Sequence, residues 1–272
     1  MEHIEKALAR AREMRSAHMN TGGSAGQTGQ NGFTRGPAGR ETASMNGVTP
    51  DYTVTPIVQG NQLSLHSHRL VADDFKHPIA DVYRLLRAQV LQRMKKLNMT
   101  TLVVTSARLG DGASTTAANL AISIALDVNQ TVLLVDLNLR EPTIHRKFGI
   151  SPNKGIEDYL RSECELKDCL LNPGLKRMVV LPARASKGDA AEILSSPRMA
   201  ALVKELRSRY ADRIIIFDAP PVLESGETLG FLPNADGVLF VARSGHTTKA
   251  EVDRAADLLR NYQVVGTLLN AC

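Results

Sequence analysis

The residues best suited to chemistry lie in one short glycine-containing segment. It reads Ser106-Ala107-Arg108-Leu109-Gly110-Asp111-Gly112-Ala113-Ser114-Thr115. An apolar run over residues 101–105 precedes it and a run with helical periodicity over 116–126 follows, which is the strand, loop and helix context of a phosphate-binding loop. In such a loop, backbone N–H groups hold phosphate oxygens and a hydroxyl such as that of Ser114 binds Mg²⁺. The segment therefore predicts a site for ATP or ADP with Mg²⁺.

One position of this loop departs from the intact motif. Ala113 stands where phosphate-binding loops carry a lysine, whose charge neutralises the β- and γ-phosphate oxygens. A charge-assisted contact contributes about 1.5–3 kcal/mol to binding, whereas removal of a donor aimed at transition-state charge lowers a rate about 10²- to 10³-fold. We therefore expect weak nucleotide binding together with weakened or absent catalysis.

Two further acids lie at the ends of apolar runs. Asp136 follows the run 131–135, with Asn138 two residues beyond it, and Asp218 follows the run 213–217. An acid that leaves a buried strand beside a phosphate-binding loop is the usual Mg²⁺ partner. Taken singly, each aspartate is also a common turn residue. Their presence together with the loop favours a metal site.

The elements that must position these residues alternate along the chain. Strands are expected at 101–105, 131–135, 178–181, 213–217, 237–241 and 264–269. Helices are expected from about residue 74 to 90, over 115–126, 196–210 and 248–261, and within 155–171. This alternation predicts an α/β fold of the P-loop NTPase type, a doubly wound and mostly parallel sheet with helices on both faces. Ligands of such sheets bind at the carboxyl ends of the strands.

The part ahead of this core has a different composition. Residues 1–19 show an amphipathic helical pattern, and 20–73 form a linker rich in Gly, Ser and Thr, so that the core domain is expected over 74–272. A short amphipathic helix on a flexible tether suits a docking element. A frayed terminus without a partner is the alternative.

Charge and hydropathy limit the possible partners and location. The net charge of +5 arises within residues 1–99, because the remainder of the chain holds equal numbers of basic and acidic residues. This distribution predicts no nucleic-acid-binding face on the core. The acidic start and the short apolar runs predict neither a secretory signal nor a membrane span. We expect a cytoplasmic protein, peripheral to the inner membrane only through a partner or its N-terminal helix.

The order of these motifs resembles the cytoplasmic domain of the bacterial tyrosine autokinases (BY-kinases) of capsule and exopolysaccharide export. The segment from Asp136 to Pro142 resembles the Walker A′ motif of that family, and Asp218-Ala219-Pro220-Pro221 resembles its Walker B motif. The resemblance runs from about residue 81 to 270. The N-terminal helix, the linker and residues 192–196 look most like the subgroup associated with exosortase-linked systems.

The resemblance implies partners and a role for each site residue. It implies a Wzz-like polysaccharide co-polymerase in the membrane as partner, and self-association through a helix that carries Asp81, Arg84 and Arg87. It places Asn270 near the base, and it implies phosphate-binding, metal-binding and catalytic sets. These sets are Gly110, Asp111, Gly112, Ala113, Ser114 and Thr115 for the phosphates, Ser114, Asp136 and Asp218 for Mg²⁺, and Asp136, Asn138 and Asp218 for catalysis.

Three departures from the family pattern predict a degenerate kinase. Ala113 replaces the lysine, Asn138 replaces the second Walker A′ carboxylate, and residues 268–272 contain no tyrosine cluster. An active autokinase or ATPase is the first alternative, with Arg108 as the cation that replaces the lysine or with Ala113 as an engineered substitution. A positioning ATPase of the MinD/ParA type is the second.

Overall fold

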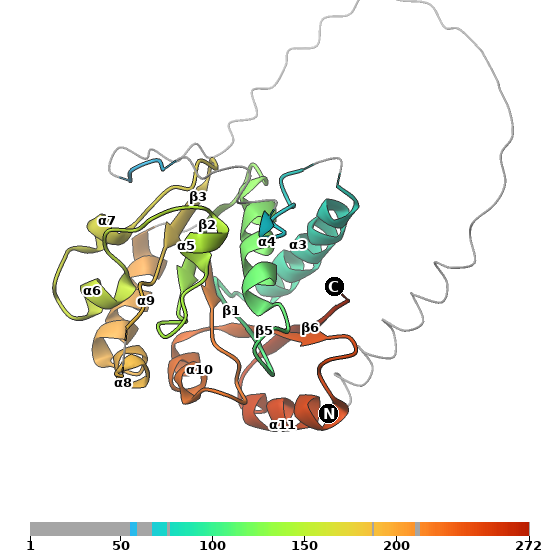
Figure 1. Ribbon diagram of the computed structural model, residues 1–272. Helices are drawn as coiled ribbons and strands as arrows, with labels where there is room; N and C mark the ends of the chain where they lie inside the picture. The colour runs from blue at the N-terminus through green and yellow to red at the C-terminus, as the bar shows by residue number, and fades with distance from the viewer. Residues whose placement is uncertain (1–54, 59–66, 75–76, 187, 210–212, 272) are drawn as a thin grey trace, which may run out of the picture. The chain divides into compact units, whose positions relative to one another are not determined.

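Six strands form one parallel sheet in the order β3-β2-β4-β1-β5-β6 (Figure 1). Their bounds are β1 Thr101–Ser106, β2 Thr131–Asp136, β3 Met178–Leu181, β4 Arg213–Asp218, β5 Gly237–Arg243 and β6 Val264–Asn270. The first five are buried along almost their whole length, as expected for strands covered on both faces. The predicted fold class is confirmed.

The structure is a computed structural model that describes residues 55–58, 67–74, 77–186, 188–209 and 213–271. The predicted N-terminal helix at 1–19 and most of the predicted linker lie outside these residues. The described residues all belong to one unit, Val48–Cys272. No helix within the described ranges is both long and apolar enough to cross a membrane.

Helices cover both faces of the sheet. Their bounds are α3 Pro78–Lys96, α4 Ala113–Ala125, α5 Ile144–Lys147, α6 Ile156–Leu160, α7 Leu166–Cys169, α8 Ala190–Leu194, α9 Pro197–Arg209, α10 Gly226–Phe231, η1 Leu232–Asn234 and α11 Lys249–Leu259. The almost fully buried helix α4 packs on one face, where Ile216 of β4 joins its core cluster, and α3 lies beside it (Figure 1). The next residue, Phe217, points to the opposite face and contacts Phe231 of α10, with ring centroids 4.7 Å apart. Successive strand residues thus alternate between two cores.

Several element bounds differ from the predictions. Helix α4 begins at Ala113 rather than at residue 115, and β2 and β4 include Asp136 and Asp218. The short helices α5, α8 and α10 were not predicted, because one turn or little more shows no clear apolar periodicity.

The folded core also begins before residue 74. Leu70 and Ala72 are buried in the core cluster, although they fall within the range predicted as linker. The Asn119 side chain of α4 fixes this segment, because its Oδ1 accepts hydrogen bonds from the N–H groups of Val71 at 2.9 Å and Ala72 at 3.1 Å. The Asn119 side chain, in the middle of α4, therefore binds the backbone of residues 71–72 to the core, although the composition of this segment is typical of a linker.

Candidate nucleotide site

The loop between β1 and α4 has a backbone conformation that depends on its glycines. Gly110 and Gly112 have φ values of 88° and 98°, in the left-handed region that side chains disfavour. A Cβ at Gly112 would also collide with the Nδ2 atom of Asn270, at the end of β6. Ala113 follows as the first residue of α4 and lies buried in the cavity wall. The backbone around position 113 is therefore that of a phosphate-binding loop, although the lysine is absent.

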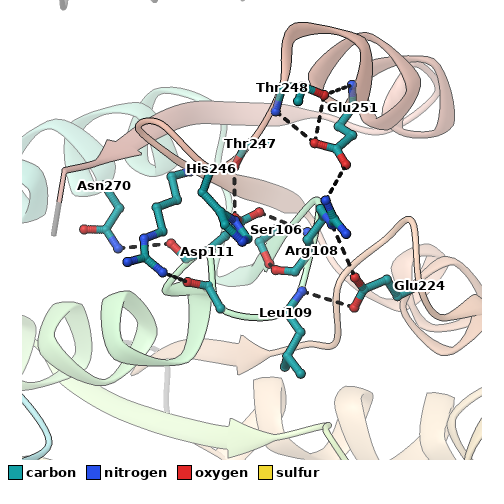
Figure 2. A network of polar contacts seen from close by, with 12 residues as sticks. Ser106, Arg108, Leu109, Asp111, Glu224, His246, Thr247, Thr248, Glu251 and Asn270 are labelled. Atoms are coloured by element: carbon teal, nitrogen blue, oxygen red, sulfur yellow. Dashed lines mark hydrogen bonds and ion pairs between the residues drawn. The ribbon is translucent and has the colours of Figure 1, made fainter.

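The carboxylate of Asp111 fixes the loop from within (Figure 2). Its Oδ2 accepts the N–H of Arg108 at 2.9 Å. Its Oδ1 accepts the Thr247 hydroxyl at 2.9 Å and lies 2.9 Å from His246 Nδ1. Asn270 completes this network, because its amide donates to the Asp111 carbonyl at 3.0 Å. The Asp111 side chain thus supports the loop and is engaged with protein groups.

A cavity of about 940 Å³ opens beside this loop. That volume is at the upper end of the range, about 300–1,000 Å³, of small-molecule sites. Its walls combine the loop with residues from distant parts of the chain. They include Gly110, Gly112, Ala113, Ser114, Thr115, Asn138, Thr143, Lys147, Arg243 and Asn270. The structure therefore brings most of the predicted phosphate-binding residues together with Asn138 and Asn270 around one cavity.

Asp136 and Asp218 are both fully buried and do not line the cavity, although Asn138 and Ala219, which follow them in the sequence, do. Asp136 Oδ1 accepts the N–H of Asn138 at 3.0 Å, and Oδ2 accepts those of Thr143 at 3.1 Å and Ile144 at 3.0 Å. Burial outweighs these hydrogen bonds and raises the pKa of Asp136 to about 7. The carboxylate of Asp136 therefore also organises the turn after β2 and the start of α5, which the sequence did not reveal.

The hydrogen bonding of the Asp218 carboxylate differs from that of Asp136. Neither carboxylate oxygen of Asp218 has a hydrogen-bond partner of good geometry. Burial, followed by the negative charge of Asp136, raises the pKa of Asp218 well above its ordinary value, while the Ser114 hydroxyl acts in the opposite direction. A buried carboxylate without a partner is costly. Such a carboxylate fits a site in which a cation is the missing partner.

The donor set fits Mg²⁺ better than a metal held by protein groups alone. Across the described part of the chain, no three His, Cys, Asp or Glu side chains form a metal cluster. Mg²⁺ normally takes one or two protein oxygens and completes its shell with phosphate oxygens and water. Ser114 and Asp218 are suitably placed to supply those oxygens, and Asp136 is the neighbouring carboxylate.

Asn138 is among the residues that line the cavity. Its Oδ1 accepts the N–H of Glu141 at 3.1 Å, so this oxygen closes the turn after β2. An amide cannot accept a proton at neutral pH as a carboxylate does. This position therefore offers polar contact without a general base.

Arg108 has its charge matched by acids outside the loop. Its guanidinium lies 3.0 Å from Glu251 Oε1 and 3.8 Å from Glu224 Oε1, and the side chain is half exposed (Figure 2). Glu251 itself caps α11 through Thr248. In this structure Arg108 therefore joins the loop to α11 and to the segment after β4.

Lys147, at the end of α5, also belongs to the site, although it is not among the residues predicted from the sequence. Its Nζ donates to the Thr115 hydroxyl at 2.9 Å, and the side chain lines the cavity. Burial lowers the pKa of Lys147, while the charges of Asp218 and Asp136 raise it. No sequence pattern pointed to this lysine, because the four residues of α5 are too few to show apolar periodicity.

Comparisons with known proteins agree with this geometry. No family model matches the chain. A tyrosine-protein kinase of Bacillus subtilis, YwqD, is 31% identical over 193 residues, which is 70% of this chain and 80% of that relative. The succinoglycan biosynthesis transport protein ExoP of Rhizobium meliloti is 27% identical over 210 residues, which is 74% of this chain and 26% of that longer relative.

Solved structures of a tyrosine kinase domain and of an ATPase also resemble this chain. The kinase domain of the Escherichia coli tyrosine kinase ETK superposes with a TM-score of 0.69 and 26% identity, covering 74% of this chain and 79% of that domain. The septum site-determining protein MinD of Pyrococcus horikoshii, solved with Mg-ADP, shares the fold with a TM-score of 0.54 and 19% identity over 62% of this chain and 69% of its own. The loop, the paired acids and these similarities together show that the chain belongs to the bacterial tyrosine kinase (BY-kinase) family.

Proposed function

We propose that this chain is a member of the family that binds Mg-ADP or Mg-ATP weakly and whose tyrosine-kinase catalysis is weakened or absent. One observation carries the proposal: Ala113 replaces the lysine within a loop whose other parts are present. The left-handed glycines and the N-terminus of α4 remain, and the Ser114 hydroxyl lies next to the buried Asp218 carboxylate. Ground-state binding draws on all of these groups, whereas transition-state stabilisation depends strongly on the missing charge.

We further propose that it acts in exopolysaccharide polymerisation and export, through nucleotide-modulated assembly with a Wzz-like co-polymerase in the membrane. The similarity to a transport protein of succinoglycan biosynthesis supports this role. The resemblance of the N-terminal region favours the exosortase-associated subgroup. On this proposal the protein stays in the cytoplasm and reaches the inner membrane through that partner or through the helix predicted at 1–19.

Self-association through α3 is part of the same proposal. Arg84 forms an ion pair with Asp81 one turn earlier, and Arg87 Nη1 donates to the Ser123 carbonyl of α4 at 2.6 Å. Val82 and Leu85 on this helix are 57% and 62% exposed. An exposed apolar pair beside a charged group is suited to contact with a second copy.

Two measurements test the function. Calorimetry of the purified full chain with Mg-ADP is expected to show weak binding that disappears when EDTA removes Mg²⁺. Incubation with Mg-ATP is expected to give little or no phosphotyrosine, while the co-polymerase co-purifies with the protein from membranes. Strong tyrosine autophosphorylation of the unmodified protein would contradict the weakened catalysis, and absence of any Mg-ADP binding would contradict the nucleotide role.

Neither alternative from the sequence is favoured. An active kinase that relies on Arg108 would need this side chain free, but it is engaged by Glu224 and Glu251. A MinD-type positioning ATPase fits less well, since MinD superposes with a TM-score of 0.54 against 0.69 for the tyrosine kinase ETK.

A further inference from the structure

A cation reaches the nucleotide cavity although the loop lacks its lysine. The Nζ atom of Lys147 lies 2.9 Å from the Thr115 hydroxyl, in the first turn of α4. The Lys147 side chain lines the same cavity as Gly112, Ala113 and Ser114. The ammonium thus stands next to the helix N-terminus at which the loop would hold phosphates.

Among the described residues, the charge of Lys147 has no counterion in direct contact, although the charges of Asp218 and Asp136 act on it from farther away. Within the described ranges, no carboxylate lies within 4.0 Å of Lys147 Nζ, and its hydrogen-bond partner is a neutral hydroxyl. Burial of the ammonium is unfavourable without an anion, which shows in the lowered pKa of this lysine. A phosphate oxygen in the cavity would supply the missing charge-assisted contact.

The position of Lys147 is fixed by its own short helix. Asp136 Oδ2 accepts the N–H groups of Thr143 and Ile144 at the start of α5. Ile144 and Phe148, at the two ends of this turn, are buried in the core cluster beside α4. A helix of four residues has little stability alone, so these anchors are what orient Lys147 toward Thr115.

Three arginines, Arg69, Arg108 and Arg243, also line the cavity, and within the described ranges none of their side chains makes a hydrogen bond to the first turn of α4. Arg108 is paired with Glu224 and Glu251 on the outer side of the loop. Arg243 extends to the Gly110 carbonyl, which its Nη1 contacts at 3.3 Å, at the opposite end of the loop from Thr115. Lys147 is the cation that contacts the first turn of α4 directly.

We propose that Lys147 supplies the phosphate-binding cation that the loop lacks at position 113, and that it contacts the phosphates of a nucleoside di- or triphosphate. This inference rests on the proposed nucleotide function. It places the charge on α5, which Asp136 anchors, so that phosphate binding is linked to the turn after β2. The Thr115 hydroxyl holds the ammonium in place before the ligand arrives.

The test is a calorimetric titration of Mg-ADP into the full chain and four variants. Lys147→Met and Lys147→Gln are expected to weaken binding about 10- to 100-fold, the range of one charge-assisted contact. Lys147→Arg keeps the charge and is expected to retain most of the affinity. Lys204→Met, which removes an exposed lysine of α9 that does not line the cavity, is the matched control and should bind like the unmodified protein. Thermal unfolding of each variant confirms that it is folded.

A second comparison uses position 113. Ala113→Lys is expected to restore binding in the Lys147→Met background and to tighten it much less in the unmodified protein, because the two ammonium groups would compete for the same phosphates. Equal gains in both backgrounds would overturn the inference. So would unchanged affinity in folded Lys147→Met or Lys147→Gln, and both results leave the proposed nucleotide function intact. Absence of Mg-ADP binding by the unmodified protein would instead overturn that function and this inference with it.

Discussion

Asp136 and Asp218 occupy directly paired positions at the carboxyl ends of the adjacent parallel strands β2 and β4. Both are fully buried, and the charge of Asp136 raises the pKa of Asp218. Their hydrogen bonding differs, because three backbone N–H groups hold Asp136 whereas the Asp218 carboxylate makes no hydrogen bond of good geometry and is approached by the Ser114 hydroxyl and the charge of Lys147. The pair thus combines a carboxylate that the backbone holds with one that no backbone N–H holds.

Replacing Asp218 with asparagine is expected to stabilise the ligand-free protein. The raised pKa means that the folded state holds a proton that the unfolded chain releases near pH 3.8. The free energy of unfolding therefore falls as the pH rises from about 3.8 through the pKa of Asp218 in the folded state. Asparagine does not ionise, so the variant does not undergo this decrease in stability. The melting temperature of Asp218→Asn should exceed that of the unmodified protein by more at pH 8 than at pH 5.

The same variant should lose the Mg²⁺-dependent part of Mg-ADP binding. Asp257→Asn changes an exposed aspartate of α11 and serves as the control. A destabilising effect of Asp218→Asn at pH 8 would show that the carboxylate has a stabilising partner in the ligand-free protein.

Replacing Asp111 with alanine is expected to loosen the loop. The change leaves the Arg108 N–H and the Thr247 hydroxyl without their buried acceptor. Each unsatisfied group costs about 1–3 kcal/mol, so the loss of two acceptor contacts should lower the free energy of unfolding, measured with urea, by about 2–6 kcal/mol. Affinity for Mg-ADP should fall as well. Stability within experimental error of the unmodified protein would mean that water replaces the carboxylate in this network.

A Gly112→Ala substitution should damage the loop for two separable reasons. The new Cβ would collide with Asn270, and the left-handed conformation costs a non-glycine residue about 1–2 kcal/mol. Asn270→Ala removes the collision but not the conformational cost, and on its own it also loses the hydrogen bond to the Asp111 carbonyl. In the Gly112→Ala background it should therefore recover part of the lost stability and Mg-ADP affinity. Chemical denaturation of the four proteins of this cycle measures the recovery, and strictly additive effects would contradict the contact.

Introducing the family's lysine at position 113 and its aspartate at position 138 should increase ATP hydrolysis. Ala113 and Asn138 line the same cavity. A lysine and an aspartate there would add a donor for transition-state charge and a proton acceptor, and one such donor typically changes a rate about 10²- to 10³-fold. Phosphate release by Ala113→Lys with Asn138→Asp is compared with that of each single variant. A double variant no faster than the unmodified protein would indicate that the loss lies elsewhere in the site.

The sequence predicted the fold class and most of the candidate site. Short apolar runs that alternate with segments of helical periodicity indicate a parallel sheet covered by helices. Strand burial and the apolar face of a helix can be read from the order of neighbouring residues alone. The glycine-containing loop, Asp136 and Asp218 each follow directly after an apolar run, which predicted that they lie at the carboxyl ends of strands. Carboxyl ends of parallel strands meet at one edge, so their proximity also followed from the sequence.

Only the tertiary structure decided which partner each polar side chain has. Asn270 contacts the Asp111 carbonyl across a separation of 159 residues, and Arg108 pairs with glutamates that follow β4 and β5. The position of Lys147 depends on α5, a single turn anchored by Asp136 and by core packing. Such contacts depend on strand order and on which face each short helix covers. Side-chain periodicity determines neither, because it reports burial of a residue and not the identity of its neighbours.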